Sequence, residues 1–414
     1  MRTMWNRCLL TEWADMHSQE STCWRNIVLA MLAALIAAFQ IGKAIIALPL
    51  LLGEPLHLDL REAGLVLSSL AIVGAVLAMP LGLLISRYDA RRLLCAGLAI
   101  IALTSFAGAY AVSVGVLLAA RVIEGVAVVM LFICASSFIG SQAASKDRDL
   151  AMAVSSTAVP GGIALVIFGA TLALSVGVSL SWTMLWQVNA WLALVCGFAL
   201  WFGISPTKKA ATSLVSEPAG GSCNHPAAIR RVTTTRGAQC IALCFSLYAI
   251  FYFAFSGFLP LLLHDLLALS QTEAGYVSAV IVASNVAGNL TAGALMRRGV
   301  ASRRIVSSGF VLGAVCVSIL FWLAVPVAVS IMLAMLMVGG MGAIPGALTA
   351  VAPKVAPSAT LVAPTIGFML QGSYIGQLIG PVASGSLAQA GGWTLVAWML
   401  LLLALVGAAL GRKL

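Results

Sequence analysis

Three charged residues lie deep inside long apolar segments, and they are the clearest candidates for chemistry in the sequence. They are Lys43, Arg121 and Glu124. A charge near the centre of a bilayer costs at least about 2.5–3.5 kcal/mol on insertion scales, so such residues normally face a cavity or an oppositely charged partner. Two cations with one carboxylate would attract an anion, and the carboxylate would be able to exchange a proton.

The composition requires lipid as the solvent for much of the chain. Of 414 residues, 61% are hydrophobic and 9% are charged, whereas ordinary soluble domains have roughly 45–50% and about 25%. Each span needs roughly 20 apolar residues, so the length predicts about twelve crossings. The apolar runs lie near 26–52, 63–86, 93–112, 114–139, 151–175, 184–204, 238–263, 274–296, 305–325, 328–352, 362–387 and 393–411.

The spans fall into two sets of six, which predicts an all-α membrane protein with two halves. One long polar stretch, 205–237, separates the sets and is expected to be a flexible cytoplasmic linker. The predicted organisation is a cytoplasmic tail over 1–25, an N-terminal half over 26–204, the linker, and a C-terminal half over 238–414.

The basic residues predict the orientation in the membrane. With the N-terminus in the cytoplasm, every lysine and arginine outside the spans lies in a cytoplasmic segment, except Arg61. This asymmetry follows the positive-inside rule and places both termini in the cytoplasm. The net charge of +10 therefore indicates membrane orientation and not nucleic-acid binding. The short loops indicate a bacterial inner membrane.

The two halves carry a repeated sequence at the end of their second span. Gly82–Arg92 closes the second predicted span and Gly293–Arg304 closes the eighth. Each segment has a glycine at the helix end, then an arginine, then a basic pair in a tight turn. Internal duplication with a binding site between the halves is a recurrent architecture of transporters.

At this loop the chain resembles the major facilitator superfamily. The residues that fit the family's loop signature are Gly82, Arg87, Tyr88, Arg91 and Arg92. Ser86 stands where the family has an aspartate, and Asp89 replaces a family glycine. The resemblance implies that this loop is a cytoplasmic gate, which latches the outward-open state through a charge contact between helices. Either Asp89 replaces the missing aspartate, or the latch is weak.

A second resemblance lies in the fourth span, where Arg121, Glu124 and Gly125 match the family's arginine–x–x–polar–glycine signature. The family's antiporter motif in the fifth span is only partly present, at Pro160–Gly162. The resemblance implies twelve transmembrane helices in two pseudo-symmetric six-helix halves. It also implies transport by alternating access.

In that fold the first and fourth helices border the central cavity, so Lys43, Arg121 and Glu124 are candidates for a shared site. At about 1.5 Å per residue, Lys43 lies roughly 13 Å, Glu124 roughly 15 Å and Arg121 roughly 10 Å from the outer end of its span. Gln40 precedes Lys43 by one turn. The functional hypothesis is anion binding by the two cations with proton exchange at Glu124. The alternatives are a purely structural buried ion pair, or a Lys43 that snorkels to the outer interface.

Two tyrosines are candidates for the second half's share of the cavity. Tyr248 and Tyr252 stand one turn apart on the seventh span, so they share a face. The alternative is aromatic packing, with the hydroxyl groups bonded to neighbouring helices.

The sequence lacks the motifs of ATP-driven pumps, metalloproteases, serine hydrolases and cysteine metal sites. There is no Walker A segment, HExxH, GxSxG or CxxC pair, so we expect neither an enzyme nor a metal or other cofactor. The leading hypothesis is a secondary transporter, coupled to protons, which carries a small organic anion and functions as a monomer in the bilayer. The alternatives are an exporter of a drug, siderophore or metabolite in the same fold, and a membrane sensor or scaffold that does not transport.

Overall fold

The computed structural model describes residues 22–53, 56–85, 88–144, 146–204, 225–358 and 361–414, and all their regular structure is helical. The first half contains α2 (Trp24–Leu51), α3 (Leu60–Ser69), α4 (Ile72–Ile85), α5 (Ala90–Ala109), α6 (Val114–Gln142), α7 (Arg148–Ser156), α8 (Ala158–Ser175) and α9 (Trp182–Gly203). The second half follows with α10 (His225–Thr233), α11 (Arg236–Ser256), α12 (Leu259–Leu267), α13 (Gln271–Arg297), α14 (Ser302–Trp322), α15 (Val327–Met341), α16 (Ala343–Val355), α17 (Val362–Gly391) and α18 (Trp393–Gly411).

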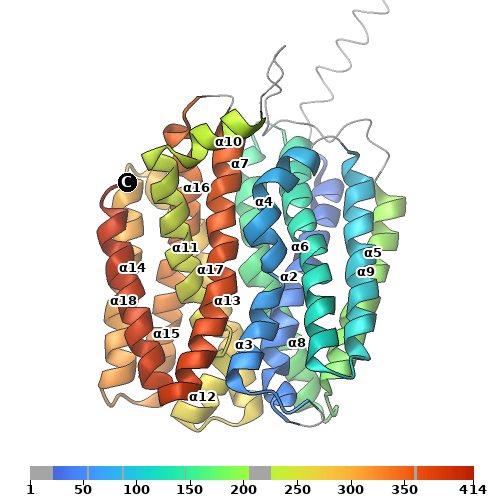
Figure 1. Cartoon of the computed structure of the whole chain (residues 1–414), viewed down its shortest axis with the longest axis vertical. Helices are drawn as coiled ribbons and strands as arrows, with labels where there is room; N and C mark the ends of the chain where they lie inside the picture. Colours follow the sequence, from blue (N-terminus) through green and yellow to red (C-terminus); the bar gives the residue numbers. More distant parts are fainter. Residues whose placement is uncertain (1–21, 54–55, 86–87, 145, 205–224, 359–360) are drawn as a thin grey trace, which may run out of the picture.

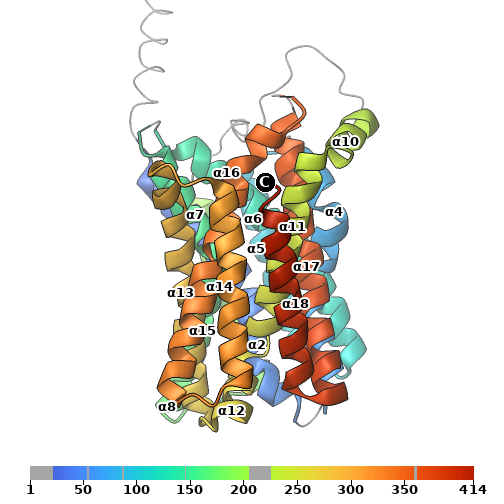
Figure 2. The same ribbon diagram turned by 90° about the vertical axis from the view of Figure 1, so that its left-hand side faces the viewer.

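These helices form the expected twelve spans in two bundles of six. Eleven segments in the described ranges are long and apolar enough to cross a membrane, with α3–α4 and α15–α16 each counted as one broken span. The twelfth is α17, a helix of 30 residues that runs through the bundle beside α11 (Figure 1). Helix α10 and the C-terminus lie at one end, here called the α10 end, and α12 lies at the opposite end, here called the α12 end (Figures 1 and 2).

The halves meet along two pairs of spans: α17 packs against the broken span α3–α4, and α8 packs against α13. Near the α12 end the backbones touch: a Cβ on Gly64 would lie 2.5 Å from the carbonyl oxygen of Pro381, and one on Gly385 would collide with that of Leu60. Small residues permit this close approach of membrane helices. The two halves are therefore joined most closely near the α12 end.

The segment predicted as a flexible linker contains a helix. In α10 the apolar side chains of Ile229 and Val232 lie three residues apart and pack with Met79 and Leu361. An amphipathic pattern stabilises a short helix when its apolar face is buried against neighbours. The segment 205–237, predicted as a flexible linker, therefore contains regular structure at 225–233 and at the start of α11.

The second span of each half begins with the same capping device. The Asp59 side chain accepts a hydrogen bond from Glu62 N at the start of α3, and Ser270 Oγ accepts one from Glu273 N at the start of α13. Each glutamate reaches back to the backbone N–H of its capping residue, which completes a capping box. The interval from Asp59 to Ser270 equals that from Gly82 to Gly293, so the internal repeat extends along the whole second span.

Candidate functional site

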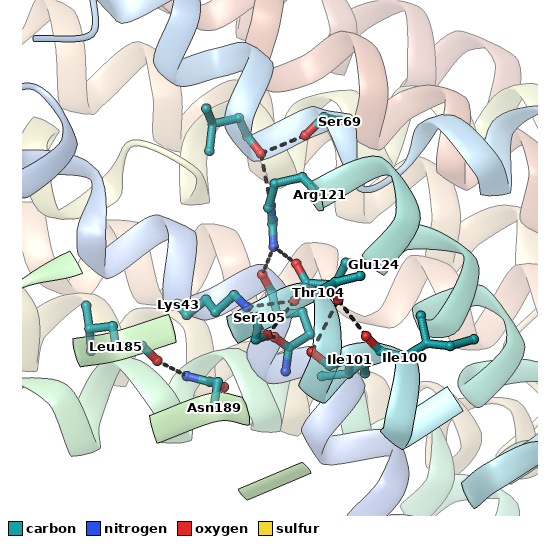
Figure 3. Close-up of polar contacts among 12 residues, drawn as sticks. Lys43, Ser69, Ile100, Ile101, Thr104, Ser105, Arg121, Glu124, Leu185 and Asn189 are labelled. Carbon is teal, nitrogen blue, oxygen red and sulfur yellow. Dashed lines mark hydrogen bonds and ion pairs between the residues drawn. The ribbon is translucent and has the colours of Figure 1, made fainter. Parts of the chain in front are cut away.

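A buried network of charges lies between α2, α5 and α6, and Glu124 is at its centre (Figure 3). Glu124 Oε1 lies 2.6 Å from Lys43 Nζ, and Oε2 lies 2.6 Å from Arg121 Nη1. Ser105 Oγ donates a hydrogen bond to Glu124 Oε1 at 2.9 Å. One carboxylate therefore forms ion pairs with two cations, which come from different helices.

Each cation has further partners that fix its position. Lys43 Nζ donates to Ser105 Oγ at 2.8 Å and lies 4.8 Å from the ring centre of Trp186, a distance at which a cation is attracted to an aromatic face. Arg121 Nη1 donates to the carbonyl oxygen of Gln40 at 2.7 Å. Arg121 Nη2 is buried and has no partner among the described residues.

The network is closed to solvent in this conformation. Lys43 and Arg121 are 0% exposed and Glu124 is 1% exposed. Lys43 therefore does not snorkel to the outer interface. Buried charges are tolerated when they are paired and hydrogen-bonded, and here the formal charge of the three groups sums to one positive charge.

Two glycines beside the network let its helices approach one another. A Cβ on Gly108 would lie 2.7 Å from Cδ1 of Trp186, so this position on α5 makes room for the ring that covers Lys43. A Cβ on Gly125 would collide with the carbonyl oxygen of Leu70 at the end of α3. The residue next to Glu124 therefore holds α6 against the broken second span.

The second half has a neutral polar cluster. Tyr248 and Tyr252 are buried and stacked, with ring centres 5.8 Å apart. Asn285 Nδ2 donates to the Tyr248 hydroxyl at 3.1 Å and to the carbonyl oxygen of Val338 at 3.0 Å. In the part of the chain that the structure describes, the buried Tyr252 hydroxyl has no partner.

Comparison with known proteins identifies the family. The family description "Major Facilitator Superfamily" matches residues 30–363 and 241–414. The chain belongs to the major facilitator superfamily. A solved structure of a bacterial homolog of the human lysosomal transporter Spinster, in an inward-facing and unoccupied conformation, is similar with a TM-score of 0.70 and 16% identity. The similarity covers 95% of this chain and 97% of that one, and it concerns the fold. The search of curated proteins gave no match.

Membership of the superfamily shows that this is a multi-pass membrane protein of a transporter family. Of the predicted cavity residues, the structure brings Gln40, Lys43, Arg121 and Glu124 together in the first half. It places Tyr248 and Tyr252 together on α11 in the second half. Their roles with a substrate or a proton stay predictions.

In the predicted gating loop, the described side chains contact their own half. Asp89 accepts a hydrogen bond from Arg92 N at 3.1 Å and caps α5. The Arg91 guanidinium lies 4.3 Å from the ring centre of Trp201 on α9 and donates to the carbonyl oxygen of that residue. In this conformation Asp89 is therefore a helix cap, and its part in a latch between helices stays a prediction. Gly82 lies in α4, and Arg87 lies outside the described residues.

Sequence reasoning missed Ser105 and Trp186, which contact Lys43 directly. Serine and tryptophan are ordinary residues in membrane helices, so neither stands out by type. The depth of Ser105 in the membrane could have identified it. At about 1.5 Å per residue, Ser105 lies about 10 Å from the outer end of the third predicted span, which is similar to the depths of Lys43, Arg121 and Glu124. No comparable signal in the sequence points to Trp186.

Proposed function

We propose that this protein is a proton-coupled carrier of a small organic anion, and that the first half supplies its charged binding groups. The observation that carries the proposal is the buried set of two cations and one carboxylate, with Arg121 Nη2 left unpartnered among the described residues. A guanidinium donates in a fork that suits a carboxylate. The free nitrogen therefore favours an anionic group as the missing acceptor.

Coupling to protons follows from competition for the same cations. While Glu124 is ionised, it forms ion pairs with both Lys43 and Arg121 and competes with a second anion for them. A proton on Glu124 would remove that negative charge and leave both cations for the carboxylate of the solute. Release of the solute then requires Glu124 to lose its proton. One proton therefore moves with each monoanion, and the cycle carries no net charge.

Alternating access would expose this network to each side in turn. The close backbone contact near the α12 end supports a conformation closed at that end. We place the α10 end in the cytoplasm, in a bacterial inner membrane, because the loops at that end carry the basic residues. The two halves, 26–204 and 238–414, would move as rigid units against each other. The linker 205–237 joins them and the tail 1–25 precedes them. We propose that the protein functions as a monomer.

A ligand screen by thermal shift tests this proposal. Detergent-purified protein is heated with lactate, benzoate, succinate, bulky lipophilic cations or siderophores, each at several pH values. A ligand that binds the folded state raises its melting temperature. We expect carboxylates to stabilise the wild type, more strongly at acid pH, and to lose this effect in Lys43→Gln. Stabilisation only by bulky or cationic compounds would contradict the anion proposal.

An exporter of an aromatic or apolar compound is the second candidate. The aromatic side chains of α11 support it, since Phe245, Tyr248, Tyr252 and Phe253 are buried in succession. Flat aromatic surfaces bind drug-like molecules by stacking. In the same screen, this candidate predicts stabilisation that survives Lys43→Gln and falls in Tyr252→Ala. If the protein is instead a sensor or scaffold, a ligand can stabilise it, but the reconstituted protein will not transport that ligand across a vesicle membrane.

A further inference from the structure

A basic cleft lies at the α10 end of the second half, away from the buried network. It has a volume of about 360 Å³ and is lined by Arg303, Arg304 and Ser307 of α14 and by Arg412, directly after α18. The three arginines are exposed. The cleft therefore opens where two membrane-spanning helices reach the bilayer surface.

The arginines of this cleft have no acidic partner among the residues that the structure describes. In the described ranges, none of the three guanidinium groups has a hydrogen-bond or ion-pair partner. Beyond residue 237 the acidic residues of the sequence are Asp265 and Glu273, which lie in α12 and in the first turn of α13, at the α12 end. The acidic side chains of the second half therefore lie at the opposite end from this cleft.

The local backbone also favours an anion. Arg303 and Arg304 lie in the first turn of α14, whose N-cap residue Ala301 makes no side-chain capping bond, so the positive end of the helix dipole is unscreened there. Ser307 follows one turn later, and its hydroxyl oxygen is buried without a partner among the described residues. A Cβ on Gly411 would lie 3.0 Å from Ser307 Oγ, so the missing side chain lets α18 close against α14.

The surface below the cleft is apolar. On α14, Val311 and Val315 continue the face of Ser307 at steps of four residues and are 44% and 49% exposed. On α18, Leu402 and Leu405 are 63% and 55% exposed. A ligand with a phosphate group at the surface and acyl chains along these two helices would match both features.

We propose that this cleft binds the phosphate group of an anionic phospholipid. Arg303, Arg304 and Arg412 supply the positive charge, and the chains of the lipid lie along α14 and α18. Arginine clusters bind phosphate oxygens through paired, charge-assisted hydrogen bonds. A soluble phosphate shares the headgroup chemistry but gains nothing from the apolar surface, so the lipid is the favoured source.

The test compares two triple variants of the full-length protein in detergent. Arg303, Arg304 and Arg412 are changed to Gln in one variant. In the matched control, the exposed Arg297, Arg298 and Lys354, which do not line the cleft, are changed to Gln. Binding of phosphatidylglycerol, phosphatidylcholine and glycerol phosphate is measured by native mass spectrometry and thermal shift at fixed ionic strength.

We expect phosphatidylglycerol to bind the wild type and the control, and to bind the cleft variant roughly tenfold or more weakly, because only that variant loses the charge-assisted hydrogen bonds between the cleft arginines and the phosphate group. If the wild type bound phosphatidylcholine as tightly as phosphatidylglycerol, or if the control lost as much affinity as the cleft variant, the proposed site would be wrong. If glycerol phosphate stabilised the wild type as much as phosphatidylglycerol does, a lipid would not be the specific occupant. Transport activity enters none of these outcomes, so they are independent of the proposed carrier function.

Discussion

The two halves of the molecule share a scaffold but differ in the chemistry of their centres. Both begin their second span with a capping box, at Asp59 and at Ser270, and both close it with a glycine and a basic loop. Both ion pairs between described residues, however, belong to the first half and converge on Glu124. The centre of the second half has stacked tyrosines and an asparagine.

This difference indicates how duplicated halves can divide their tasks. Helix caps and glycine contacts maintain the scaffold, so each half keeps them. Buried charges are costly in a membrane, and one half is enough to supply the charge for binding and coupling. The neutral half can then adapt its aromatic surface to the shape of the solute. The following predictions test this division, from the largest effect to the smallest.

Glu124→Gln should have the largest effect. The change leaves Lys43 and Arg121 buried without a counter-charge, and such a loss costs about 3–5 kcal/mol. We expect a poor yield of folded protein and a much lower unfolding midpoint in detergent. Tyr248→Phe is the control from the second half. If Glu124→Gln were as stable as the wild type, the ion pairs would not hold the first half together.

Lys43→Gln should separate stability from activity. Arg121 and Glu124 remain as a balanced pair, so the variant should fold, while binding of the anion loses a charge-assisted hydrogen bond of about 1.5–3 kcal/mol. Uptake by proteoliposomes should fall roughly 10- to 100-fold. If the variant took up the anion at the wild-type rate, Lys43 would not be part of the binding site, and its ion pair with Glu124 would have only a structural role.

The tyrosines of the second half should give smaller effects, which differ between them. Tyr248→Phe removes the acceptor of Asn285 Nδ2, yet that group keeps its bond to Val338, so we expect a loss of about 0.5–1.5 kcal/mol of stability. Tyr252→Phe removes a hydroxyl without a partner in the described structure and should unfold at the same or a higher temperature. If Tyr252→Phe were the less stable of the two, its hydroxyl would have an important partner.

Asp59→Ser should have the smallest effect, and only at acid pH. The backbone N–H of Glu62 lowers the pKa of the Asp59 carboxyl below its usual 3.8. Since the native pKa is the lower one, the stabilisation is present above about pH 4 and is lost as the pH falls through the native value. Thermal unfolding between pH 3 and 6 should show this loss in the wild type and less of it in Asp59→Ser. If the wild type and Asp59→Ser lost stability identically as the pH falls, the Asp59 carboxylate would not contribute this pH dependence.

The sequence predicted the spans, the two halves and the buried charges because these features depend on composition. An apolar run of about 20 residues has few alternatives in a membrane, and a lysine within such a run is conspicuous. It did not predict Trp186, whose place over Lys43 depends on space left by Gly108. It also missed α10, because a helix of nine residues depends on contacts with Met79 and Leu361 that only the folded chain supplies.

Proton movement during solute transport is the most direct measurement of the central proposal. Wild-type protein is reconstituted in vesicles that contain a pH-sensitive dye, and the carboxylate that stabilises it best is added on one side. The account predicts that the interior acidifies as the monoanion enters, at one proton per anion and independently of the membrane potential. Uptake of the anion without proton movement, or uptake that follows the membrane potential alone, would contradict coupling through Glu124.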